Sequence, residues 1–159
     1  MRRGIIAVLA LAFALVATAP ASADDAQLWA VYSADNPDVN RVGPQFERAL
    51  KRFERNPRRY YKSVVRTALE LDGIAAAIEA QFGPVQPSSS TGAKVKELIL
   101  LTLKETRRGY RLTAAAARNI GRGRRVGLRQ ARRADQAFAR TFRYDRRVLR
   151  GFKALGYER

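Results

Sequence analysis

The last long segment of the chain, residues 118–155, reads RNIGRGRRVGLRQARRADQAFARTFRYDRRVLRGFKAL. Its apolar residues recur at intervals of three, four and seven, which is the spacing of one face of an α-helix. This apolar stripe consists of Ala131, Phe138, Phe142, Leu149, Phe152 and Leu155. Arginines fill most of the other side of the same helix. The segment therefore predicts a basic amphipathic helix, against which the rest of the chain packs.

Three further segments, residues 44–55, 57–82 and 93–120, carry apolar stripes with the same helical spacing. Asn56 and Pro57 separate the first two, because asparagine caps a helix start and proline suits its first position. No segment shows the strict alternation of a β-strand. The sequence therefore predicts an all-α chain.

The predicted helices are joined by short connections, which favours a single-domain antiparallel bundle of about four main helices. This bundle is expected to occupy residues 44–159. Residues 83–92 (GPVQPSSSTG) are rich in Pro, Ser and Gly, and we expect a flexible loop there. Residues 24–43 show a mixed pattern and predict an N-terminal loop or short helix.

The first 23 residues have the three parts of a cleaved signal peptide. A positively charged start precedes an apolar run over residues 5–16, which is shorter than the roughly 20 residues that span a bilayer. Small residues at Ala21 and Ala23 place the cleavage before Asp24. We therefore expect a protein that is secreted or that resides in the periplasm or cell envelope.

The chain contains neither cysteine nor histidine. Their absence excludes disulfides and Cys–His or Ser–His nucleophilic catalysis, and it removes the commonest transition-metal ligand. We expect no enzyme activity, no cofactor and no metal ion. A carboxylate-dependent hydrolase is the less favoured alternative, since no spacing selects a pair among the helical carboxylates. These are Glu70, Asp72, Glu79, Glu97, Glu105, Asp135 and Asp145.

The formal net charge of the 159-residue chain is +17, and it is distributed unevenly. Residues 24–103 hold 11 Lys and Arg against 10 Asp and Glu, whereas residues 104–159 hold 18 against 4. Such a basic C-terminal face predicts binding to a polyanion: a cell-wall polymer, anionic lipid head groups or nucleic acid. The candidate binding residues are Arg118, Arg122, Arg124, Arg125, Arg129, Arg132, Arg133, Arg140, Arg143, Tyr144 and Arg147.

The alternative hypothesis is a structural or protein-partner module whose charge only confers solubility. Ionic strength separates the two hypotheses, because binding to a polyanion weakens steeply as salt rises.

Asp145 is the acidic residue whose position in the sequence is hardest to explain. At about 100° per residue it falls inside the apolar stripe, between Phe142 and Leu149. An unpaired carboxylate in a core is strongly unfavourable. We therefore expect Asp145 to be a buried charge that pairs with an Arg, Lys or Tyr of another helix, or to face a cavity.

Overall fold

The computed structural model describes residues 23–157, and all its regular elements there are α-helices. The prediction of an all-α chain is confirmed. The described part contains five helices, where the sequence predicted about four. They are α1 (Ala23–Ser33), α2 (Pro37–Arg55), α3 (Pro57–Phe82), α4 (Ser90–Gly121) and α5 (Val126–Ala154). The predicted signal peptide lies outside the described residues, apart from Ala23.

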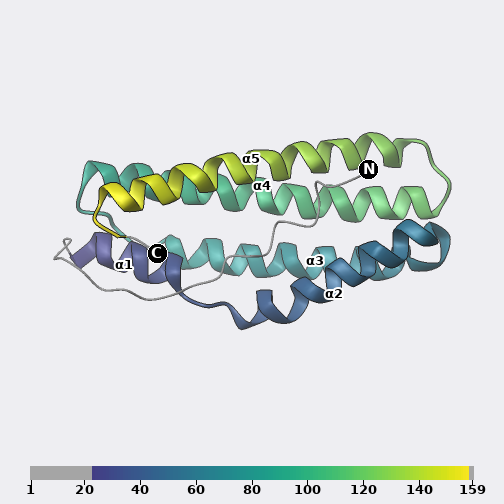
Figure 1. Ribbon diagram of the computed structural model, residues 1–159, viewed down its shortest axis with the longest axis horizontal. Coiled ribbons are helices and arrows are strands. Elements are labelled where there is room, and N and C mark those ends of the chain that lie inside the picture. Colours follow the sequence, from purple (N-terminus) through teal and green to yellow (C-terminus); the bar gives the residue numbers. More distant parts are fainter. Residues whose placement is uncertain (1–22, 158–159) are drawn as a thin grey trace.

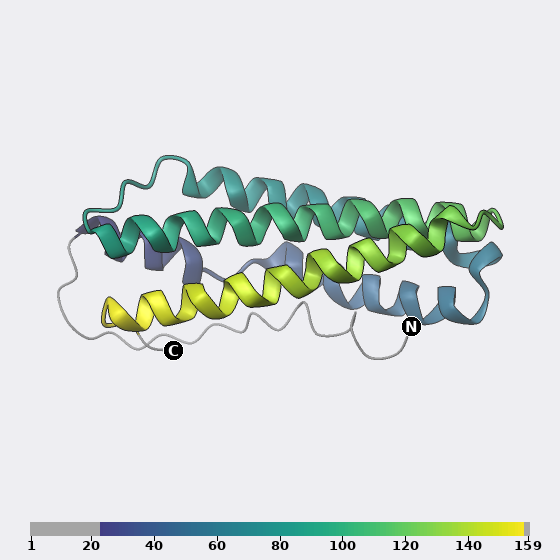
Figure 2. The ribbon, with the colours of Figure 1, turned by 90° about the horizontal axis from the view of Figure 1, so that it is seen from above.

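The three longest helices, α3, α4 and α5, lie side by side and alternate in direction along the long axis of the molecule (Figures 1 and 2). The fourth side is shared by α1 and α2, which follow one another with a break between them. Helix α2 packs on α3, and α1 lies near the C-terminal end of α5. The extra helix thus results from dividing one side of the bundle into two pieces.

The break between α1 and α2 arises from Asn36 and Pro37. The side-chain oxygen of Asn36 accepts hydrogen bonds from the backbone N–H groups of Asp38 and Val39, both at 3.1 Å. Pro37 takes the first position of α2, where its missing N–H costs nothing. Helix α2 therefore begins at Pro37 and not at residue 44, and Pro44 lies inside it with its ring exposed.

The connection between α3 and α4 is shorter than predicted, because α4 already begins at Ser90. The hydroxyl of Ser89 accepts a hydrogen bond from the backbone N–H of Gly92 at 2.8 Å and so caps the helix. The ammonium group of Lys96 donates to the carbonyl oxygens of Gly83 and Val85. The side chain of Val85 is buried. These contacts anchor the connection to the helices on either side.

The core consists of two clusters of buried side chains at different levels of the bundle. In the first, the ring of Tyr110 lies edge-on to Phe46 and Phe138, with ring centres 5.7 and 5.4 Å away. In the second, Trp29 and Tyr32 of α1 contact Phe152 of α5, each with ring centres 4.9 Å apart. The aromatic residues of α1 therefore cover the C-terminal half of α5.

Two helix-interior glycines give opposite expectations for stability. A Cβ atom on Gly109 would lie 2.6 Å from the ring of Phe138, whereas one on Gly73 would meet no atom within 4 Å. We expect Gly109→Ala to lower the free energy of unfolding by about 1–3 kcal/mol through overpacking. We expect Gly73→Ala to raise it by about 0.5–1 kcal/mol through helix propensity. Urea unfolding followed by circular dichroism measures both, and equal shifts would contradict the close approach of α4 and α5.

Candidate functional site

Two helical connections meet at one end of the bundle. The α2–α3 connection and the α4–α5 connection lie at the same end in both views (Figures 1 and 2). They are in contact, because a Cβ atom on Gly121 would come within 2.5 Å of the ring of Tyr61. Segments about sixty residues apart in sequence therefore form one surface.

This surface is strongly basic, and we call it the basic end. Its members lie in residues 48–66 and 118–133, where Glu54 is the single acidic residue. All members are exposed, and none of their side chains forms an ion pair with a residue of the described part. They are Arg48, Lys51, Arg52, Arg55, Arg58, Arg59, Lys62, Arg66, Arg118, Arg122, Arg124, Arg125, Arg129, Arg132 and Arg133.

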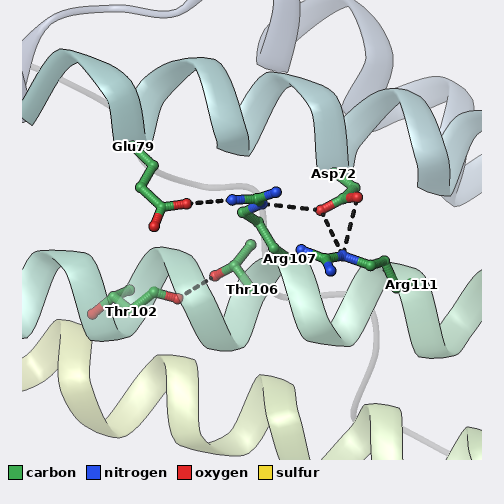
Figure 3. Close-up of polar contacts among 6 residues, drawn as sticks. All are labelled: Asp72, Glu79, Thr102, Thr106, Arg107 and Arg111. Carbon is green, nitrogen blue, oxygen red and sulfur yellow. Dashed lines mark hydrogen bonds and ion pairs between the residues drawn. The ribbon is translucent and has the colours of Figure 1, made fainter.

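Arginines nearer the middle of the bundle are ion-paired. Arg107 of α4 lies between Asp72 and Glu79 of α3, and Arg111 joins it on Asp72 at 3.1 Å (Figure 3). Hydrogen bonds to Glu79 and then to Asp72 raise the pKa of Arg107, which keeps it charged. These pairs tie α3 to α4 and occupy the carboxylates. Arg107 and Arg111 are therefore less available to an anionic ligand than the arginines of the basic end, which have no carboxylate partner among the described residues.

The structure divides the candidate residues of the C-terminal segment into two groups. Those from residues 118–133 lie at the basic end, whereas the others lie further along α5, toward its C-terminus. In this second group Arg140 pairs with Glu105 at 2.9 Å, so it is not a free cation. Arg143 and Arg147 are exposed, and Tyr144 is half-buried. The exposed arginines of α5 therefore form two groups, with the ion-paired Arg140 between them.

Sequence reasoning missed the contribution of residues 48–66. Their charge was averaged over residues 24–103, which are nearly neutral as a whole. A shorter window would have shown eight basic residues against one acidic residue. The α2–α3 connection lies beside the α4–α5 connection only in the tertiary structure, and no count of charges along the sequence predicts this.

Apolar and aromatic side chains stand among these cations. The guanidinium of Arg59 lies 5.4 Å from the ring centre of Tyr60. Val126 and Leu128, at the start of α5, have exposed fractions of 37% and 54%. The basic end therefore offers positive charge together with apolar contact area.

Asp145 lies between Thr141 and Val148 in the inward-facing row of α5, at the place where the row lines a cavity. It is half-buried and not enclosed as expected. The hydroxyl of Tyr32, on α1, donates a hydrogen bond to Oδ1 of Asp145 at 2.8 Å. The cavity has a volume of about 520 Å³. Asp145 therefore has a tyrosine partner from another helix and also faces a cavity.

Two buried polar groups at the other end of the molecule were not foreseen. Oδ1 of Asp25 and the hydroxyl of Tyr157 are buried, and neither has a hydrogen-bond partner within the described residues. Burial, and secondarily the charge of Asp25, raises the pKa of Tyr157.

Of the predicted cleavage positions, Ala23 and Asp24 belong to the first turn of α1, and Ala21 lies outside the described residues.

The helical carboxylates face arginines more than one another. Asp72, Glu79 and Glu105 each pair with at least one arginine, and Glu70 pairs with Arg41 at 3.1 Å. Over residues 23–157, no group of three or more acidic residues is placed to hold a metal ion. Nor is any helix of that part long and apolar enough to cross a membrane.

Comparison with known proteins gives no relative for this chain. It matches no protein-family model, and no curated protein or solved structure is significantly similar to it.

Proposed function

We propose that this protein is exported and binds a polyanion through the basic end, without catalysing a reaction. The observation that carries the proposal is the contrast between two sets of arginines. Those that join the long helices, such as Arg107 and Arg140, are paired with carboxylates. The fifteen cations of the basic end have no such partner among the described residues.

The chemistry of arginine supports this proposal. A guanidinium group is planar, stays charged and matches the oxygens of a phosphate or carboxylate in pairs. At the basic end these exposed groups belong to the end of α2, the start of α3, the end of α4 and the start of α5, and to the connections between them, so the packing of the helices holds them near one another. Unpaired like charges repel one another, and a polyanion that neutralises them releases its own counterions on binding.

The side chains between the cations bear on the kind of polyanion. Exposed Val126 and Leu128 can enter the interface of an anionic membrane, where apolar contact adds to charge attraction. The ring of Tyr60 can stack on a nucleobase. The shared chemistry is a dense array of phosphate, sulfate or carboxylate groups, and the experiment distinguishes its sources.

Binding of the purified protein to heparin, duplex DNA, anionic vesicles and cell-wall polymer tests the proposal. We expect affinity for at least one of these to fall by about 10³–10⁵ between roughly 50 and 200 mM salt, as for proteins with six to ten phosphate contacts. Phosphatidylcholine vesicles and dextran are the uncharged controls, and they should not bind. Loss of vesicle binding alone in Leu128→Ser would assign the function to a lipid surface.

No binding to any of the four, or binding that does not respond to salt, would reject the proposal. The protein would then be a structural or protein-partner module whose charge serves solubility.

A further inference from the structure

The cavity beside Asp145 lies between the two core clusters. Leu71 and Tyr110 of the first cluster line it, and so do Phe82 and Ile99 of the second. It exists because α1 ends at Ser33 and α2 begins only at Pro37, so no helix of the described part covers the fourth side of the bundle at this level. The short connection between them borders the cavity and carries exposed polar residues.

The cavity is large enough for a small organic molecule, and its walls are mostly apolar. Its volume of about 520 Å³ falls within the usual range of ligand pockets, roughly 300–1,000 Å³. Helices α3, α4 and α5 supply the apolar wall. Its main side chains are Ile74, Ile78, Phe82, Ile99, Leu103 and Leu149.

Among the described residues, every charged side chain that lines this cavity is acidic. They are Asp35, Asp38 and Asp145, and no Lys or Arg of residues 23–157 lines it, although the chain carries a net charge of +17. The amide of Asn40 donates to Asp35 at 2.8 Å, and Arg41 pairs with Asp38 at 3.0 Å. Asp145 forms no ion pair with a described residue, and Tyr32 occupies only its Oδ1. Its second oxygen is therefore available to a ligand.

A second polar group lines the same cavity. Tyr110 is 3% exposed, and its hydroxyl forms no hydrogen bond with any described residue. Burial raises the pKa of Tyr110, so its hydroxyl remains a neutral donor and acceptor. The hydroxyl oxygen itself is not among the fully buried atoms that lack a partner, so a ligand or water in the cavity can reach it. The hydroxyls of Thr106 and Thr141, by contrast, have partners: they lie 3.2 Å apart, and they are within hydrogen-bond distance of the carbonyl oxygens of Thr102 and Ala137, respectively.

We propose that this cavity binds an organic cation, a protonated amine with an apolar body. The ammonium group lies at Asp145, and the apolar body lies between α3 and α4, against Ile78 and Leu103. The acidic lining disfavours carboxylates and phosphates there, which the basic end attracts. The two sites thus select ligands of opposite charge, and this inference does not depend on the proposed function.

Three probes that share one alkyl chain test the inference: octylammonium, octanol and octanoate, each titrated calorimetrically below its micelle-forming concentration. We expect octylammonium to bind most tightly, octanol more weakly and octanoate not at all. Asp145→Asn should weaken octylammonium about 10- to 100-fold, because it removes a charge-assisted hydrogen bond. The same variant should leave octanol within about threefold.

Two further variants separate binding in the cavity from binding elsewhere. Asp135→Asn removes an exposed carboxylate of the same helix that does not line the cavity, and it should leave all affinities unchanged. Ala75→Leu places added volume into the cavity and should weaken octylammonium and octanol alike. Circular dichroism checks that each variant is folded.

The inference is overturned if octylammonium binds no better than octanol, or if Asp135→Asn weakens it as much as Asp145→Asn. Should Asp145→Asn not fold, retention of octylammonium affinity in Ala75→Leu would overturn it equally.

Discussion

Phe138→Ala is expected to lower the free energy of unfolding by about 3–5 kcal/mol, the usual cost of truncating a fully buried phenylalanine. Phe138 is 2% exposed and lies at the centre of the first core cluster. Its ring meets Tyr110 edge-on and covers the face of α4 at Gly109. The ring packs on α4, so its removal leaves a cavity between α4 and α5 that adds to the lost transfer free energy. Urea unfolding followed by circular dichroism measures the change.

Phe142→Ala is the matched control on the same helix. Phe142 is half-buried and borders the cavity, so its ring already lacks close neighbours on one side. We expect a decrease of less than about 2 kcal/mol, since only part of the ring leaves an apolar environment. The sequence placed both rings in one stripe. Equal decreases would show that α5 is rotated from the orientation described here.

The second large effect concerns the α4–α5 connection. Replacing Arg118, Arg122, Arg124 and Arg125 by Gln should weaken binding to the polyanion on the order of 10²–10³-fold at about 0.1 M salt, if these side chains neutralise two to four phosphates. The slope of log affinity against log salt should become flatter by about two to four. Glutamine is nearly as good a helix former as arginine, and these side chains are exposed, so stability should not change.

A variant with the same charge change elsewhere on the chain is the control. Arg143, Arg146, Arg147 and Arg150 are exposed on the C-terminal half of α5, away from the basic end. Replacing these four by Gln should change affinity less than tenfold, because only the general field of the protein is reduced. If this control weakens binding as strongly as the first variant, binding follows net charge and the basic end has no special role.

The helices were predictable where apolar periodicity and capping residues agree. Helix α3 begins at Pro57 and ends at Phe82, as Asn56 and Gly83 indicate. For residues 24–43 the sequence left a loop and a short helix open, because the few apolar residues of α1 give no clear amphipathic stripe. The structure shows a helix there, packed through tertiary contacts. Its Leu28 and Tyr32 are buried against α5 and the α3–α4 region.

The candidate sites were predictable only in part, for a physical reason in each case. Asp145 could be identified from the sequence, because helical periodicity alone places it in the apolar stripe of its own helix. The cavity beside it could not be predicted, because a void depends on where α1 and α2 end relative to α3. Only part of the basic end was predicted. Residues 118–133 are rich in positive charge within the sequence itself, whereas residues 48–66 come close to them only in the folded structure.

The central claim is that both connections form one polyanion-binding surface, and the α2–α3 connection tests it most directly. The measurement is the salt dependence of polyanion affinity for a variant with Arg55, Arg58, Arg59 and Lys62 replaced by Gln, compared with the wild-type protein. A joint surface predicts a slope flatter by about two to four, as for the α4–α5 variant, at roughly 0.9 for each phosphate that the variant no longer neutralises. A slope and affinity equal to those of the wild type would contradict it, and would confine binding to α5 and the end of α4.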